Sequence, residues 1–146
     1  MPLTITIMKR NTIKFLTAAI VLLLLSLSTF GQSIPIGKWR LIAHKFDEQK
    51  EVVSKNSSTT LIIGRDGRVG GNTGCNVFGG EYTVEDGVFR IGGLISTMMA
   101  CEEPSPEFEY KYLDVLRNAT DFKIRKSVLT IHDPKTRSML RFTPIK

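Results

Sequence analysis

Cysteine and histidine are scarce in this sequence, which has two of each among its 146 residues. A tetrahedral metal site needs four ligands at clustered spacing, and the positions of His44, Cys75, Cys101 and His132 show no such cluster. We therefore expect no metal site, and no other pattern indicates a cofactor. The two histidines fall in strand-like segments, where a lone histidine is usually structural.

A hydrophobic run long enough to span a membrane is also lacking. The apolar run at 15–27 has 13 residues, whereas a spanning helix needs about 20. It follows a basic segment at 9–14, and the small residues Thr29 and Gly31 suit signal-peptidase cleavage after Gly31. We interpret residues 1–31 as a secretory signal peptide, with an uncleaved amino-terminal anchor as the alternative. Because no cysteine directly follows the run, we expect no lipid attachment and no stable membrane anchor after cleavage.

The excess of positive charge is small once the signal peptide is set aside. The whole chain has 20 Lys and Arg against 14 Asp and Glu, but three of the basic residues and none of the acidic ones lie in the signal peptide. The remainder carries 17 basic and 14 acidic side chains, a formal charge of +3. The densest basic cluster, Lys123, Arg125 and Lys126, is typical of a solvated strand face. The small net charge and the expected export of the protein both argue against a nucleic-acid partner, so we expect none.

A phosphate-binding loop is missing despite the glycine run at 70–80. The run lacks a Gly-Lys-Ser/Thr ending and no helical pattern follows it, so it is not a P-loop. Glycine adopts positive φ freely, and Asn76 does so at low energetic cost, which indicates a shaped loop around Cys75. We interpret it as a tight turn that presents Cys75 to Cys101.

The two cysteines stand 26 positions apart. In an exported protein such a pair is most simply a disulfide, and we expect Cys75 and Cys101 to form one. Two buried free thiols remain an alternative, as does a catalytic or metal-binding role.

Alternating hydrophobicity predicts many short strands. They are expected at 37–44, 59–63, 78–84, 88–91, 121–125, 128–132 and 138–142, and residues 69–71 are expected to continue into the glycine-rich loop. The alternation in the first strand puts Trp39 inward and His44 on the opposite face. Asp-Gly pairs at 66–67 and 86–87 are typical of type I′ hairpin turns. Gly-Gly at 92–93 predicts a further turn, and the polar stretch 47–58 predicts a loop.

One helix is predicted at about 106–117. Ser105 is a favourable N-cap and Pro106 suits the first helical position. Apolar residues at i, i+4, i+7 and i+8 give the helix one apolar face, formed by Phe108, Tyr112, Val115 and Leu116. Strands and helix together predict a mainly β (α+β) domain, an antiparallel meander curled into a barrel-like sheet with one amphipathic helix.

No catalytic constellation stands out. The acidic residues between 102 and 109 suit the positive end of a helix dipole, with weak cation binding as the alternative. The His-Asp pair at 132–133 precedes a proline and is typical of a turn rather than of a catalytic dyad. Met98 and Met99 are a candidate soft contact surface, although core filling is the commoner use of methionine. We predict that the protein is not an enzyme.

The glycine run and the segment around the second cysteine carry a family resemblance. Gly-Cys-Asn at 74–76, Phe-Gly-Gly-Glu-Tyr at 78–82 and Thr-Met-Met-Ala-Cys at 97–101, followed by a helix with Leu-Asp-Val-Leu at 113–116, closely resemble the META domain of the HslJ-like family. The resemblance covers about residues 34–145. Its motif residues in this chain are Gly74, Cys75, Asn76, Gly80, Tyr82, Thr97, Met99 and Cys101.

The resemblance implies a compact β-rich, barrel-like domain with one helix, found in bacterial envelope proteins and linked to the heat-shock response and novobiocin resistance. It implies no enzymatic activity and no cofactor. Many members of the family are lipoproteins, and this chain departs from them in lacking the lipid-attachment cysteine. We therefore expect a periplasmic or secreted protein.

Two functions are consistent with these patterns. The first is a non-enzymatic protein of envelope stress tolerance that binds a peptide, a protein or a small apolar ligand through the barrel and its motif loops. The alternative is an inhibitor or assembly partner of an envelope enzyme, acting through the loop at 47–58. An open apolar cavity favours the first, and a filled interior with a projecting ordered loop favours the second.

Overall fold

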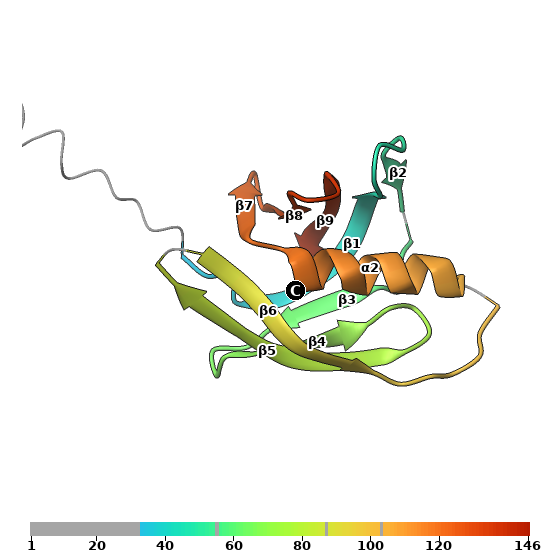
Figure 1. The fold of residues 1–146 in the computed structure, drawn as a ribbon, viewed down its shortest axis with the longest axis horizontal. Helices are drawn as coiled ribbons and strands as arrows, with labels where there is room; N and C mark the ends of the chain where they lie inside the picture. Colours follow the sequence, from blue (N-terminus) through green and yellow to red (C-terminus); the bar gives the residue numbers. More distant parts are fainter. Residues whose placement is uncertain (1–32, 55, 87, 103) are drawn as a thin grey trace, which may run out of the picture. The chain divides into compact units, whose positions relative to one another are not determined.

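The computed structural model describes residues 33–146 except positions 55, 87 and 103, so the signal peptide predicted at 1–31 lies outside the described residues. The described residues form one antiparallel sheet of nine strands and a single helix (Figure 1). The strands are β1 (Gly37–Lys45), β2 (Val52–Val53), β3 (Thr60–Ile63), β4 (Arg68–Asn72), β5 (Val77–Glu85), β6 (Val88–Ser96), β7 (Asp121–Arg125), β8 (Val128–Asp133) and β9 (Ser138–Pro144). The helix, α2, spans Pro106–Asn118.

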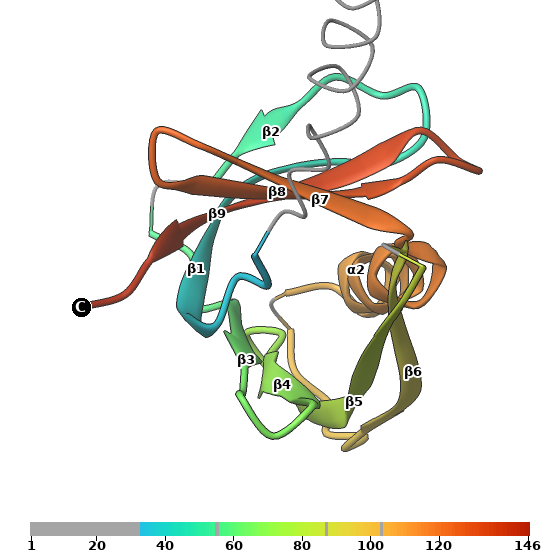
Figure 2. The same ribbon diagram turned by 90° about the vertical axis from the view of Figure 1, so that its left-hand side faces the viewer.

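The sheet is a meander that curls back on itself. Its strand order is β6-β5-β4-β3-β1-β9-β8-β7, and β2 pairs with β1 beside this path. Figure 2 shows the sheet curving from β7–β9 through β1 to β3–β6. The helix α2 lies in the opening between strands β7–β9 and strands β3–β6. At that opening, the Phe89 amide of β6 donates a hydrogen bond to the Thr120 carbonyl just before β7 (3.2 Å). The predicted mainly β, antiparallel and curled fold with one helix is confirmed.

The helix forms where its capping residues and its apolar face predict it. Ser105 Oγ accepts a hydrogen bond from the Phe108 amide (3.2 Å), and Pro106 follows it directly. The buried face consists of Tyr112, Leu113, Val115 and Leu116. Three of these four were predicted, whereas Phe108 is only partly buried against the core.

Side chains fill the space between the helix and the sheet. Tyr112 of α2 lies fully buried at its centre, with its ring 5.7 Å from that of Phe78 and 6.4 Å from that of Phe142. Burial raises the pKa of the Tyr112 hydroxyl, which donates to the Thr60 carbonyl at 3.4 Å. The core residues all belong to the unit Ile34–Lys146, which therefore folds around its own core. No helix among the described residues is long and apolar enough to span a membrane.

A bulge in β1 changes which way His44 points. The register with β9 shifts between Leu41 and Ala43, so β1 carries an extra residue there. Because strand side chains alternate, one extra residue reverses the pattern beyond it. His44 therefore pairs with Leu140, which is fully buried, and its ring lies against Phe108. The expected position of His44 on the opposite face was wrong.

Gly92 and Gly93 also form a bulge instead of the predicted turn. Gly92 pairs with Glu81 while Ile95 pairs with Gly79, so β6 continues through this segment with one extra residue. Gly93 has a positive φ (61°), the geometry of a bulge whose first residue is a left-handed glycine.

A type I′ geometry occurs in the connection between the strands predicted at 121–125 and 128–132, where no turn type was predicted. Lys126 and Ser127, with φ of 49° and 61°, join Arg125 to Val128 as a two-residue hairpin. Such turns usually contain Gly, Asn or Asp, and this one contains none of them. The Asp-Gly pair at 66–67, by contrast, has a positive φ only at its glycine (80°) and does not form the predicted type I′ turn.

Candidate functional site

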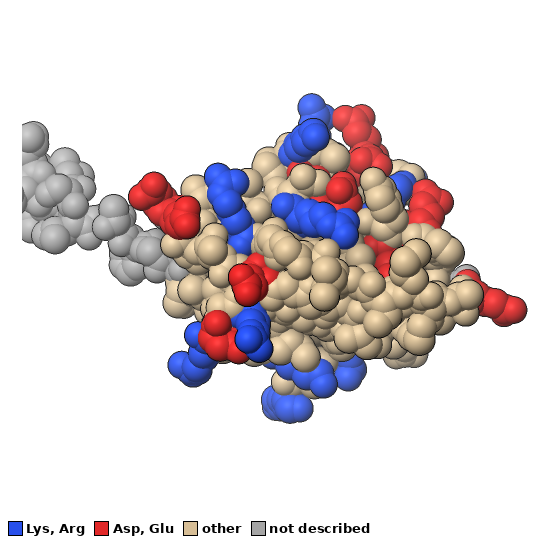
Figure 3. All heavy atoms as spheres, turned by 60° about the horizontal axis from the view of Figure 1, so that its bottom comes forward, with Lys and Arg blue, Asp and Glu red and all other residues tan. Residues whose placement is uncertain are grey.

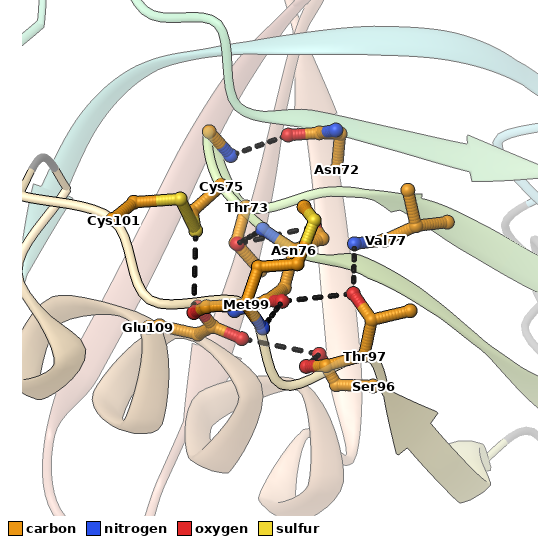
Figure 4. Close-up of a disulfide and its surroundings, with 11 residues drawn as sticks. Asn72, Thr73, Cys75, Asn76, Val77, Ser96, Thr97, Met99, Cys101 and Glu109 are labelled. Atoms are coloured by element: carbon orange, nitrogen blue, oxygen red, sulfur yellow. Dashed lines mark hydrogen bonds between the residues drawn. A yellow bond between two sulfur atoms is a disulfide. The ribbon is translucent and has the colours of Figure 1, made fainter.

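The two halves of the motif meet at the side chain of Asn76, which is 5% exposed (Figure 4). Its Oδ1 accepts hydrogen bonds from Thr97 Oγ1 (2.8 Å) and from the Met99 amide (2.7 Å). Thr97 also pairs with Val77, donating through its amide and accepting through its hydroxyl. The turn after β4 and the segment after β6 are therefore joined by one buried amide.

The amide nitrogen of the Asn76 side chain forms a hydrogen bond to the helix α2. Asn76 Nδ2 donates to Glu109 Oε2 at 2.7 Å, and Ser96 Oγ donates to Glu109 Oε1 at 3.1 Å. Sequence reasoning assigned Glu109 to the helix dipole and missed this contact. Nothing in the pattern distinguishes it from Glu107, which instead forms an ion pair with Lys111 (3.1 Å).

The turn that carries Asn76 is closed by Thr73. The Thr73 amide donates to the Asn76 carbonyl (2.8 Å), and the Asn76 amide donates to Thr73 Oγ1 (3.0 Å). Gly74 has a φ of +106°, and a Cβ there would lie 2.8 Å from Pro104 Cδ. Glycine is therefore required at position 74 for conformation and for space. Among Gly74, Cys75 and Asn76, positive φ occurs at Gly74.

A disulfide makes a second connection between the same two segments. Cys75 and Cys101 are bonded, with their Cα atoms 6.0 Å apart. Cys75 Sγ lies 3.6 Å from the Met99 carbonyl oxygen. A disulfide sulfur carries no hydrogen, so this is a packing contact rather than a hydrogen bond. Asn76 and the disulfide thus tie the segment after β6 to the turn before β5 at adjacent points.

Two predicted motif residues lie outside this cluster. Gly80 of β5 packs against β6, where a Cβ would lie 2.7 Å from the Gly92 carbonyl oxygen. Tyr82 donates its hydroxyl to the Gly64 carbonyl (2.8 Å) and its amide to the Gly67 carbonyl (2.8 Å). Both residues shape the sheet and the turn between β3 and β4, so the motif divides into a joined cluster and a separate pair.

An apolar groove of about 460 Å³ lies beside the joined cluster. The segment after β6 forms one side and α2 the other; its apolar lining includes Met98, Met99, Ala100, Pro104, Tyr110 and Leu113. Met98 is 98% exposed, Met99 56% and Tyr110 67%, so the methionines do not fill the core. Figure 3 shows a broad uncharged surface on the face formed by β5, β6 and the following segment. We call the apolar groove between the segment after β6 and α2 the motif groove.

Two acidic residues of the helix start, Glu107 and Glu109, bind different partners. Glu107 pairs with Lys111, and Glu109 is held by Asn76 and Ser96. Within the part of the chain that the structure describes, no three histidine, cysteine, aspartate or glutamate side chains gather as a metal site would require. The weak cation site considered from sequence therefore has no cluster to support it there.

His44 occupies an aromatic pocket next to the start of α2. Its ring centroid lies 4.7 Å from that of Phe46 and 5.1 Å from that of Phe108. Its Nδ1 is buried and has no hydrogen-bond partner among the described residues. Burial lowers the His44 pKa because the charged ring loses solvation. His132 lies apart from it, on β8.

His44 gives a pH-dependent prediction. Its folded-state pKa lies below the ordinary 6.5, so its contribution to stability is full above pH 6.5 and is lost as the pH falls through the folded-state pKa. We expect the free energy of unfolding to decrease from about pH 7.5 to about pH 5, and to decrease less in the His44→Phe variant. Urea unfolding of both proteins at both pH values measures the difference, and equal decreases contradict the prediction.

The sequence matches the META domain family over residues 32–144, which is most of the chain. The chain belongs to the META domain family. The match includes both halves of the motif and the helix that Asn76 holds. Among curated proteins, no sequence matches this META domain protein.

Solved structures with a similar fold include two NMR structures and one crystal structure. A protein from Burkholderia xenovorans has a TM-score of 0.63 at 24% identity, covering 80% of this chain and 86% of its own. A second NMR structure has a TM-score of 0.58 at 20% identity, covering 80% and 95%. A DUF4847 family protein from Bacteroides vulgatus has a TM-score of 0.52 at 12% identity, covering 73% and 91%. At these identities the similarity concerns the fold alone.

Proposed function

We propose that this META domain protein is a non-enzymatic binding protein of the bacterial envelope, periplasmic or secreted, that contributes to stress tolerance. Its ligand is a small apolar molecule or an apolar segment of a partner protein, held in the motif groove. The observation that carries the proposal is the exposure of Met98, Met99 and Tyr110 around an apolar groove. Exposed apolar surface of this kind is typical of interaction sites, and methionine adapts to varied partners.

The internal bonding of the motif supports a structural role for its polar residues. Both ends of the Asn76 amide and both oxygens of the Glu109 carboxylate are engaged within the protein. The sulfur atoms of Cys75 and Cys101 are bonded to each other. A nucleophile or general base needs an available lone pair near the substrate, so these groups suit positioning of the groove better than catalysis.

The interior of the curled sheet is filled by side chains, so the proposed ligand site is the motif groove on the surface. Tyr112 and its neighbours occupy the space between helix and sheet, so a ligand is expected at the surface rather than inside the curled sheet. The same observation favours the alternative, an inhibitor or assembly partner acting through 47–58. That segment exposes Val52 (50%) and Val53 (66%) on β2, which pairs with β1. Glu48 and Glu51 form surface ion pairs with Arg137 and Arg141.

A neutral fluorescent probe tests the groove directly. We expect N-phenyl-1-naphthylamine to bind and to shift the NMR signals of Met98, Met99 and Tyr110. Met98→Asp should weaken binding about tenfold, since a carboxylate beside an apolar ligand must lose solvation. Val84→Asp, an exposed apolar residue near the far end of β5, is the matched control and should bind like the wild type.

Two results would contradict the groove proposal. One is the absence of probe-induced shifts around Met98, and the other is an equal loss of binding in the Val84→Asp control. Capture of an envelope protein that is abolished by Val53→Asp but unaffected by Met98→Asp would support the alternative function through 47–58.

A further inference from the structure

The outer face of β7, β8 and β9, on the side away from α2, carries unpaired positive charge. Lys123 and Arg125 stand two residues apart on β7, so their side chains point to the same face, and Lys126 follows in the turn. All three are exposed, and no described residue forms an ion pair with them. Asp121 is the acidic residue of β7 on this face.

The positive charge extends across the sheet. Lys123 pairs with Thr130, which pairs with Arg141 two strands away. In the next row, Met139 pairs with Lys45 of β1. Side chains of one face are about 7 Å apart along a strand and about 10 Å apart across two strands. The basic residues are therefore spread over a plane and do not form a single line.

This face also has a shallow hollow of about 520 Å³ among the basic residues. Val128 and Met139 contribute apolar side chains to its lining, beside the polar side chains of Thr130 and His132. Arg141 at its border donates to Glu51 Oε1 at 2.8 Å, so part of its charge is neutralised. None of the residues that line this hollow also lines the motif groove.

We propose that the outer face of β7–β9 is a peripheral docking surface for an anionic phospholipid membrane. Phosphate groups of the lipids meet Lys123, Arg125 and Lys126, while Val128 and Met139 contact the apolar part of the interface. The contact is separate from ligand binding in the motif groove.

Charge and shape together select a bilayer as the partner. A membrane surface presents phosphates in two dimensions together with apolar surface, which matches basic side chains on several strands with Val128 and Met139 among them. A linear polyanion such as duplex DNA presents phosphates along a groove and favours cations arranged in a stripe. Each cation contributes about fivefold to the partitioning on an anionic bilayer, so three contribute about 100-fold.

Vesicle sedimentation tests the proposal with the chain that begins at Gln32, which contains the complete described fold. We expect binding to vesicles made of equal parts phosphatidylglycerol and phosphatidylcholine at about 0.1 M salt, and loss of binding at about 1 M salt. Pure phosphatidylcholine vesicles should not bind. The triple variant Lys123→Gln, Arg125→Gln, Lys126→Gln should bind about 100-fold more weakly.

A charge-matched variant separates this surface from the effect of net charge. This second triple variant carries Arg65→Gln, Arg68→Gln and Arg90→Gln, which remove three exposed cations from the turn after β3, from β4 and from β6. It should bind vesicles like the wild type. The proposal is overturned by an equal loss in this control or by no binding to anionic vesicles. Binding of the protein to a short DNA duplex at the same salt, without binding to vesicles, would overturn the membrane proposal in favour of a linear polyanion.

Discussion

Replacing Asn76 with alanine should lower the free energy of unfolding by about 3.5 to 5 kcal/mol. The change removes two hydrogen bonds to Oδ1 and one from Nδ2 to the Glu109 carboxylate. Neutral hydrogen bonds contribute about 1 kcal/mol each and one to a charged group about 1.5 to 3 kcal/mol. The Met99 amide loses its partner in a partly buried position, which adds to the loss. Urea unfolding followed by circular dichroism measures it.

Asn118→Ala is the matched control for this prediction. Asn118 Nδ2 donates one hydrogen bond to the Asp114 carbonyl near the end of the same helix (3.0 Å), so its loss should remain near 1 kcal/mol. If the Asn76 and Asn118 variants lose equal stability, Asn76 contributes no more than an ordinary helix-end contact. The assignment of Asn76 as the connection between the two halves of the motif would then be wrong.

Removal of the disulfide should lower the free energy of unfolding by about 3.5 kcal/mol in the chain-entropy model. The bond between Cys75 and Cys101 has a sequence separation of 26, and closing a loop of that length restricts the unfolded chain. Reductant should therefore destabilise the wild type. The variant with both Cys75→Ala and Cys101→Ala should be destabilised without reductant and unaffected by it.

A thiol titration of the unfolded chain decides whether the bond forms. Without reductant we expect no reactive thiol, and with reductant we expect the thiols of Cys75 and Cys101. Reactive thiols at both positions without reductant would contradict the disulfide. They would also reopen the metal-binding and redox alternatives that the cysteine pattern left open.

The secondary structure was largely predictable because periodicity is local. Alternation predicted the strands, and Ser105 with Pro106 predicted the beginning of α2. The orientation of His44 was not predictable, because the bulge depends on how β1 pairs with a strand about 100 positions later. The type I′ geometry at Lys126 and Ser127 was also not predicted, since these residues adopt positive φ without being the usual residue types.

The site was only partly predictable. The expectation of an oxidising compartment predicted the pairing of the two cysteines, Cys75 and Cys101, because that inference needs no tertiary contact. The partnership of Asn76 with Glu109 depends on the helix packing beside β6, which no local pattern encodes. The exposure of Met98 was also not predictable from the sequence, because an apolar side chain is expected to be buried unless the fold leaves it uncovered.

Asn76, Thr97, Met99 and Glu109 form one hydrogen-bonded cluster that joins the turn before β5, the segment after β6 and α2. Urea unfolding of a double-mutant cycle at Asn76 and Glu109 tests this claim most directly. Asn76→Asp places a carboxylate against Glu109 and should destabilise strongly, while adding Glu109→Gln restores a donor opposite the acceptor. We predict that the double variant is more stable than Asn76→Asp alone, with a coupling energy of at least about 1.5 kcal/mol. Losses that simply add would contradict the claim.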